Sequence, residues 1–143
     1  MNEIVFINHE ISFRLHHKTD LRNWLDAVAL NEGYFIEELS YIFCDDKFLL
    51  TMNKKYLQHH TLTDVITFDN SIEKKSIIGD IFISKERIAA NAKTYKVTVT
   101  DELHRVMVHG LLHLCGYTDK TPETKKKMTA RENFYLNVRE FNT

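Results

Sequence analysis

The sequence predicts a single α/β (α+β) domain spanning residues 1–143, with a small mixed sheet of about four strands packed with about five helices. A length of 143 residues is usual for one compact domain. Hydrophobic residues make up 43% and charged residues 27%, as in globular proteins, and four glycines and one proline leave no flexible linker. Short β-branched runs also alternate with segments of helical spacing. The strand order stays open.

The first half of the chain alternates strand patterns with helical ones. Residues 4–7 and 11–13 are short runs rich in β-branched and aromatic side chains, and both are expected to be strands. A helix should follow from a cap at Thr19 or Asp20 to about residue 31, where Gly33 stops it. Residues 38–44 then alternate as a strand does, and residues 46–57 return to helical spacing.

The second half holds two expected strands, 64–68 and 77–83. The second is nearly all apolar, which predicts burial on both faces, and its Gly79 suggests a bulge or a close backbone approach. Each of three expected helices follows a residue that favours the N-cap position. They begin at Ser84, at Thr100 or Asp101, and at Thr121 with Pro122 in the first turn.

Composition limits the classes of function. A formal net charge of -1 argues against tight bulk binding of duplex nucleic acid, although a local basic groove remains possible. Cys44 and Cys115 are far apart in the sequence and fit no CxxC pattern, so a reduced cytoplasmic protein is expected. The N-terminus lacks a signal-peptide pattern, and no apolar stretch approaches the roughly 18 residues of a membrane span.

The informative segment is HGLLHLCGYTD, residues 109–119. His109 and His113 are four apart on an expected helix, so both rings lie on one face and can reach one ion. Gly116 can end the helix and turn the chain so that Asp119 supplies a carboxylate. Two imidazoles and one carboxylate suit one Zn²⁺, or another divalent transition metal, with a fourth position left for water.

Two readings compete with a catalytic metal here. A bare pair of histidines at this spacing is as consistent with a packed amphipathic helix, and the Gly-x-x-Asp continuation is what favours a metal. Zinc proteases of the H-E-x-x-H type carry a glutamate base directly after the first histidine. This chain has Gly110 at that position, which weakens the metalloprotease alternative.

The same segment resembles the H-G-x-L-H-L-x-G-Y-D-H signature of the YbeY-type endoribonucleases, also described as ribosomal RNA maturation factors. Other blocks resemble the family in order between residues 37 and 136. They are Asn53 and Tyr56 for N-x-x-Y, residues 63–68 for T-D-V-L-S-F, residues 78–81 for L-G-D-I, and Met128 and Glu132 for M-x-x-x-E.

The resemblance implies a metal-dependent endoribonuclease that cuts single-stranded RNA, processes the 3′ end of 16S ribosomal RNA and acts with the small ribosomal subunit. Two positions depart from the family pattern. Its third histidine falls on Asp119 and the preceding aspartate on Thr118, while its arginine after N-x-x-Y falls on Leu57. The candidate substitutes for that arginine's cation are Lys54, Lys55, His59 and His60.

Several further residues are candidates with an ordinary structural alternative. Asp64 and Asp80 could orient a ligand histidine or the metal-bound water, or could bond backbone at strand ends. Arg105 could bind phosphate, but a salt bridge to Glu102 or Asp101 is favoured. A basic patch near the site loop could hold an RNA backbone or be a solvated face. Its members are Lys120, Lys125, Lys126, Lys127 and Arg131.

The main hypothesis is therefore an endoribonuclease in which His109, His113 and Asp119 hold the metal. Attack by metal-bound water and attack by the RNA's own 2′-hydroxyl are both possible. The alternatives are a metal hydrolase of another class, such as a metalloprotease, and a non-enzymatic ribosome-associated module with a structural metal. The pattern gives no expectation for the oligomeric state.

Overall fold

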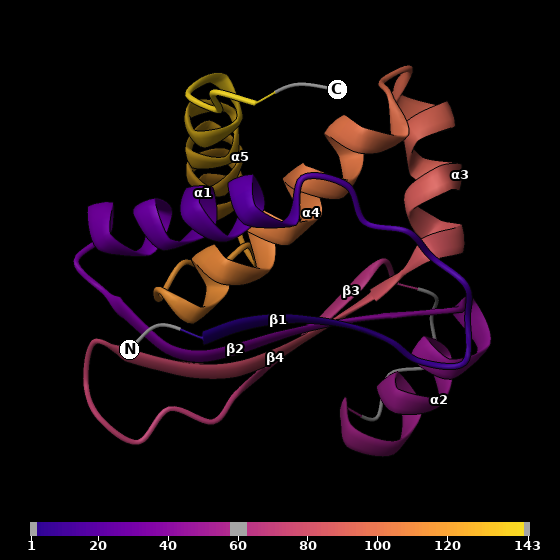
Figure 1. Cartoon of the computed structure of the whole chain (residues 1–143), viewed down its shortest axis with the longest axis horizontal. Helices are drawn as coiled ribbons and strands as arrows, with labels where there is room; N and C mark the ends of the chain where they lie inside the picture. The colour runs from indigo at the N-terminus through magenta and orange to yellow at the C-terminus, as the bar shows by residue number, and fades with distance from the viewer. Residues whose placement is uncertain (1–2, 58–62, 142–143) are drawn as a thin grey trace.

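The protein, described here from a computed structural model over residues 3–57 and 63–141, contains a four-stranded mixed sheet (Figure 1). Its strands are β1 (Glu3–Asn8), β2 (Phe35–Cys44), β3 (Val65–Asp69) and β4 (Ser76–Ser84), in the order β1-β2-β4-β3. The first two pairs are parallel, and β3 runs antiparallel to β4. The predicted fold class is confirmed.

The described residues form five helices: α1 (Lys18–Asn31), α2 (Asp46–Leu57), α3 (Lys85–Tyr95), α4 (Val99–Leu114) and α5 (Pro122–Asn137). Figure 1 shows α1, α4 and α5 over one face of the sheet and α2 below the other. This arrangement follows from the parallel pairing, because each crossover between parallel strands places a helix on a face of the sheet.

The main core lies between the sheet and α1, α4 and α5, while a smaller cluster of Cys44, Leu49 and Ile66 lies under α2. β4 borders both. Its residues alternate between buried and half-buried. The expectation that this strand is buried on both faces is therefore wrong, because α2 covers its second face only in part.

Helix α4 packs closely against β4, and two glycines make this possible. A Cβ atom on Gly79 would lie 2.8 Å from Leu114 Cδ1, and one on Gly110 would lie 2.9 Å from Ile81 Cγ2. Of the two alternatives predicted for Gly79, a bulge or a close backbone approach, the structure shows the close approach. The irregularity in the β2–β4 pairing lies elsewhere, between Ile36 and Glu38. Close packing fixes the height of α4 above the sheet.

Residues 11–13 are not a strand, contrary to the prediction. The chain leaves β1 through Glu10, whose φ of 53° turns it out of the sheet direction. Phe13 then packs its ring 4.8 Å from that of Phe43, so the apolar pattern reflects burial of an irregular segment.

Two helices begin earlier than predicted. His17, with a φ of 61°, precedes α1 in place of Thr19 or Asp20. Thr98, rather than Thr100 or Asp101, caps α4 and accepts a hydrogen bond from the Asp101 amide at 3.0 Å. Thr98 and Thr100 are equally suitable N-cap residues by type. The tight turn that ends α3, with Lys96 at φ 57°, places Thr98 at the start of α4.

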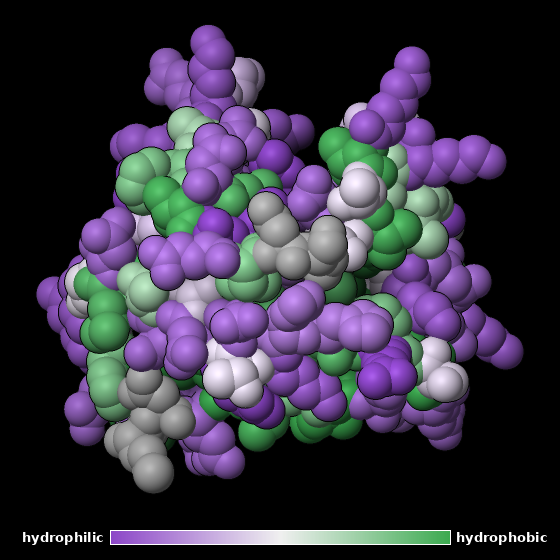
Figure 2. All heavy atoms as spheres, turned by 45° about the horizontal axis from the view of Figure 1, so that its top comes forward, coloured by the Kyte–Doolittle hydropathy of each residue, from purple (hydrophilic) through white to green (hydrophobic). Residues whose placement is uncertain are grey.

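The surface is mixed. On the face that Figure 2 shows, hydrophobic residues appear between hydrophilic ones rather than as one broad patch. Within the described ranges, no helix is both long and apolar enough to cross a membrane.

Candidate metal centre

The last two turns of α4 and the loop that follows bring three of the predicted side chains together. The Nε2 atoms of His109 and His113 are 3.0 Å apart. Asp119 Oδ2 lies 3.4 Å from His109 Nε2 and 3.5 Å from His113 Nε2. Four-residue spacing puts the two rings one turn apart, and the turn at Gly116, with a φ of 95°, returns the chain toward them.

Both imidazoles are oriented through their other ring nitrogen. His109 Nδ1 lies 2.6 Å from Glu132 Oε2, and His113 Nδ1 lies 3.0 Å from the carbonyl oxygen of Tyr117. A carbonyl and a carboxylate only accept hydrogen bonds, so both Nδ1 atoms carry the proton. In the neutral rings, the two Nε2 atoms therefore present lone pairs to each other and to Asp119.

Lone pairs that converge in this way need a cation between them. Ligands about 2.0–2.1 Å from a tetrahedral zinc ion lie about 3.3 Å from one another, and the three separations here are 3.0, 3.4 and 3.5 Å. In the described part of the chain, this trio is the group of His, Cys, Asp or Glu side chains that could hold a metal. The donor atoms thus fit a zinc-like ion.

The pKa values of the two histidines shift in opposite directions. Burial opposes charge on His109, but the hydrogen bond and negative charge of Glu132 outweigh burial and raise the pKa of His109. Burial lowers the pKa of His113, and the positive charge of His109 lowers it further. The pair therefore favours one positive charge between its rings, which a metal cation can also supply.

Glu132 was matched only to a family motif at the sequence level, and its contacts give it a structural role. It lies on α5 with its side chain 8% exposed, and its Oε1 accepts a hydrogen bond from Arg105 Nη1 at 2.8 Å. Its other oxygen holds His109. Such a partner fixes the tautomer and orientation of a metal-binding histidine.

The loop after Gly116 is anchored from the end of α1. Tyr117 donates its hydroxyl to Glu32 Oε1 at 2.8 Å. Glu32 is also bonded by Arg131 and by the Tyr135 hydroxyl, both from α5. Because the Tyr117 carbonyl holds His113, this polar cluster positions one of the two imidazoles.

The two strand aspartates lie differently. Asp64 precedes β3 and is close enough to contribute to the raised pKa of His109, while its side chain accepts a bond from Asn91 at 3.3 Å. Asp80 alternates with Gly79 and Ile81, whose side-chain positions face α4. It therefore faces the opposite side of β4, where it accepts a bond from Asn70 at 3.3 Å.

Arg105 does not pair with Glu102 or Asp101, so that expectation is wrong. Its two terminal nitrogens donate to Glu132 and, at 2.6 Å, to Asn133. Asp101 instead accepts from Arg139 at 3.0 Å. The partners come from the C-terminal helix and the segment after it, which a reading based on neighbours within α4 could not reveal.

The proposed cations near Leu57 lie away from the cluster or outside the described residues. Lys54 and Lys55 are exposed in the last turn of α2, which covers the opposite face of the sheet from α4 (Figure 1). His59 and His60 fall outside the described residues.

In the predicted basic patch, Lys120 and the three successive lysines of α5 are exposed, whereas Arg131 is engaged by Glu32 at 2.7 Å. Lys127 lines a pocket beside the loop that follows Gly116.

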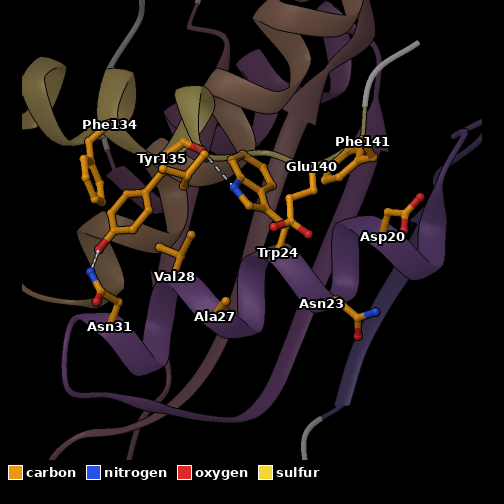
Figure 3. Close-up of a pocket in the computed structure, with 11 residues that line it drawn as sticks. Asp20, Asn23, Trp24, Ala27, Val28, Asn31, Phe134, Tyr135, Glu140 and Phe141 are labelled. Carbon is orange, nitrogen blue, oxygen red and sulfur yellow. Dashed lines mark hydrogen bonds between the residues drawn. The ribbon is translucent and has the colours of Figure 1, made fainter.

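A pocket of about 630 Å³ lies between α1 and α5 (Figure 3). Its lining includes Trp24 and Tyr135 but none of the three clustered side chains. Smaller pockets of about 400 and 250 Å³ adjoin the loop between α4 and α5 that carries Asp119 (the metal loop), and His113 lines the smaller of the two. The chemistry of the donor atoms, rather than pocket size, therefore locates the candidate site.

Fold and cluster together define a single-domain α/β protein with a helix-borne potential metal centre. A model of the family described as "Endoribonuclease YbeY" matches residues 4–140. The chain belongs to the endoribonuclease YbeY family, which confirms the resemblance seen in the sequence motifs. The name supports the predicted class of enzyme, a nuclease hydrolase.

Individual relatives agree. The chain is 49% identical over 138 residues to an endoribonuclease YbeY from Cytophaga hutchinsonii, covering 96% of each protein. It is 46% identical to one from Flavobacterium psychrophilum, covering 94% of this chain and 96% of the relative. The solution structure of TM1509 from Thermotoga maritima matches with a TM-score of 0.63 at 20% identity, covering 97% of this chain and 96% of that one. This last match concerns the fold.

Proposed function

We propose that the protein is a metal-dependent endoribonuclease whose metal, zinc by the donor set, is held by His109 Nε2, His113 Nε2 and Asp119 Oδ2. The observation that carries the proposal is the convergence of these three atoms within 3.5 Å of one another while both Nδ1 atoms are tied elsewhere. When bound, such an ion acidifies a water ligand to a pKa of about 7 and polarises a phosphoryl oxygen.

The chain's own residues orient that chemistry. Glu132 and the Tyr117 carbonyl keep the protons of both imidazoles on Nδ1, so that Nε2 stays available. Three protein ligands leave one side of the centre open to solvent and substrate. Asp64, near His109, is the candidate for orienting the attacking group. Asp80 faces the other side of β4, so it affects the metal centre only through the position of that strand.

The substrate class is single-stranded RNA. The name shared by the relatives supports RNA cleavage, and the motif resemblance supports processing of the 3′ end of 16S ribosomal RNA with the small ribosomal subunit. The two separated cysteines favour a location in the cytoplasm. Gly110 occupies the position of a protease base and packs on Ile81. The proteolytic alternative therefore has neither the residue nor the room for it.

Metal analysis combined with a cleavage assay tests the proposal. Purified protein should carry about one zinc per chain and cut a labelled single-stranded RNA, and a chelator should abolish cleavage. His109→Ala should lose both metal and cleavage, whereas His16→Ala, which removes an exposed histidine outside the cluster, should lose neither. Equal cleavage by wild type and His109→Ala would refute the nuclease assignment.

The products separate the remaining alternatives. A 2′,3′-cyclic phosphate end would identify the RNA's 2′-hydroxyl as the nucleophile and exclude simple water attack. Chelator-sensitive cleavage of casein without cleavage of RNA would favour the protease reading. Loss of metal and thermal stability in His113→Ala, with no RNA cleavage by wild type, would identify a structural metal in a non-enzymatic module.

A further inference from the structure

Two pockets meet beside the metal loop and form one groove. They share Tyr34, Lys75 and Gly116 in their linings. The smaller, of about 250 Å³, is bordered by His113, and the larger, of about 400 Å³, by Tyr117 and Lys127. The flanking groove, as we call these two pockets together, therefore leads directly away from the candidate metal centre.

Lys75 stands at the junction of the two pockets in an unusual conformation. Its φ of 67° is uncommon for a residue other than glycine. The neighbouring strand holds this backbone in place, because the Phe35 amide donates to the Lys75 carbonyl at 2.8 Å. The Lys75 ammonium lies 4.3 Å from the centroid of the Tyr34 ring, within the range of a cation–π contact.

These contacts pre-organise a lysine that would otherwise be free. An exposed lysine loses side-chain entropy when a ligand holds it, and this loss opposes binding. Anchored backbone and a ring beneath the ammonium reduce that cost. A left-handed backbone and a fixed cation at the mouth of a groove are features that favour a binding role over a solvated surface role.

The charges of the two pockets differ. In the larger pocket, Lys75 and Lys127 face one acid, Glu32, whose carboxylate is already bonded by Arg131 and two tyrosine hydroxyls. This pocket therefore has a surplus of positive charge, which suits a phosphate.

The smaller pocket has a different lining. Its ring and aliphatic surface comes from Tyr34 and Leu114, and hydroxyls and acids surround it. Its charged members are Asp69 and Glu73, balanced by Lys74 and Lys75, and its hydroxyls are those of Ser71 and Ser76. Hydroxyl and carboxylate groups can bond ribose hydroxyls and exocyclic amines, and an aromatic ring can support a base. This pocket suits a nucleoside.

We propose that the flanking groove binds one nucleotide of single-stranded RNA adjacent to the scissile phosphate, with its phosphate between Lys75 and Lys127 and its nucleoside in the pocket beside His113. The inference rests on the proposed function for its substrate class. It extends that function by assigning a substrate subsite to Lys75, on the turn between β3 and β4, and to Lys127, on α5. Both lysines lie outside the metal cluster and outside the matched motifs.

Binding without cleavage tests the groove on its own. A fluorescein-labelled 12-nucleotide single-stranded RNA is titrated in chelator, with fluorescence anisotropy recorded at several salt concentrations. Lys75→Gln and Lys127→Gln should each bind about fivefold more weakly, and the slope of log affinity against log salt should fall by about 0.7 per lost phosphate contact. Lys93→Gln removes an equally exposed lysine from α3 and should match wild type.

Cleavage kinetics give a second readout. Because the groove lies beside the reacting centre, both groove variants should raise KM about fivefold with kcat within twofold of wild type. Lys127 is exposed on a helix, so its variant remains informative even if Lys75→Gln disturbs the turn.

The outcomes keep the two proposals apart. If wild type cuts RNA but both groove variants bind and cut as Lys93→Gln does, the groove proposal is wrong and the endoribonuclease proposal stands. If wild type binds RNA through Lys75 and Lys127 but never cuts it, the endoribonuclease proposal is wrong, and the groove remains an RNA-binding site with no role in cleavage.

Discussion

Replacing Glu132 with glutamine should loosen the metal without unfolding the protein. Both carboxylate oxygens are engaged, Oε1 by Arg105 at 2.8 Å and Oε2 by His109 Nδ1 at 2.6 Å. Glutamine has nearly the same shape but offers one acceptor and one donor. Whichever way its amide is turned, the NH₂ group meets another donor.

The size of the loss in metal affinity depends on which of the two contacts of Glu132 the glutamine gives up. If the NH₂ group faced His109, the imidazole would have to move its proton to Nε2 and lose its lone pair for the metal. Facing Arg105 costs less, because the Arg105 side chain is 34% exposed and water can reach it. His109 then keeps an acceptor, but a neutral one, and a neutral hydrogen bond is roughly half as strong as a charge-assisted one. A loss of about 1–1.5 kcal/mol corresponds to roughly tenfold weaker metal binding.

Competitive titration of zinc against a chromophoric chelator measures this directly, with melting of the metal-free proteins to confirm that they fold. Asn133→Ala is the matched control, because it removes the other partner of Arg105, at 2.6 Å, and leaves His109 untouched. It should bind zinc like wild type. A folded Glu132→Gln protein with zinc affinity within twofold of wild type would refute the assigned role of Glu132.

Three further results are expected. His104 is buried and its Nδ1 accepts from Arg139 at 2.7 Å, and burial followed by that positive charge lowers its pKa to about 4 from 6.5. Neutral His104 therefore adds stability above pH 6.5 that is lost as the pH falls toward 4; urea unfolding should show a loss of about 3 kcal/mol over this range, absent in His104→Gln. Gly79→Ala would place a methyl group 2.8 Å from Leu114 Cδ1, so its unfolding free energy should fall by about 1–3 kcal/mol, and an unchanged melting curve would contradict the close packing. Burial raises the pKa of Cys115 and of Cys44 to about 12. A thiol reagent at pH 8 should therefore label neither cysteine until the protein unfolds, and rapid labelling of the native protein would contradict this burial.

Local spacing was enough to predict that His109, His113 and Asp119 lie together. His109 and His113 meet because helical geometry requires it, and a glycine at the helix end returns the chain to Asp119. The same holds for most elements, whose caps and alternation are properties of a few neighbouring residues.

Contacts between distant segments could not be predicted in the same way. Glu132 reaches His109 only because α5 packs across α4, and Glu32 reaches Tyr117 only because α1 ends beside the metal loop. Neither residue has a local pattern that names its partner. The segment 11–13 failed for a related reason, since its alternation is the same whether an apolar residue packs from a strand or from an irregular chain.

The position of Asp119 also bears on how the proposed centre meets its substrate. A divalent ion held by two neutral imidazoles keeps its full charge, whereas a carboxylate ligand reduces the net charge to about +1. Glu132 adds a negative charge behind His109, largely balanced by Arg105 at 2.8 Å. The centre is thus less positive than one with a third histidine, and it attracts an RNA phosphate less strongly. The cations that border the adjoining groove therefore have more to supply in this chain, since a polyanion must be held near a centre of low net charge.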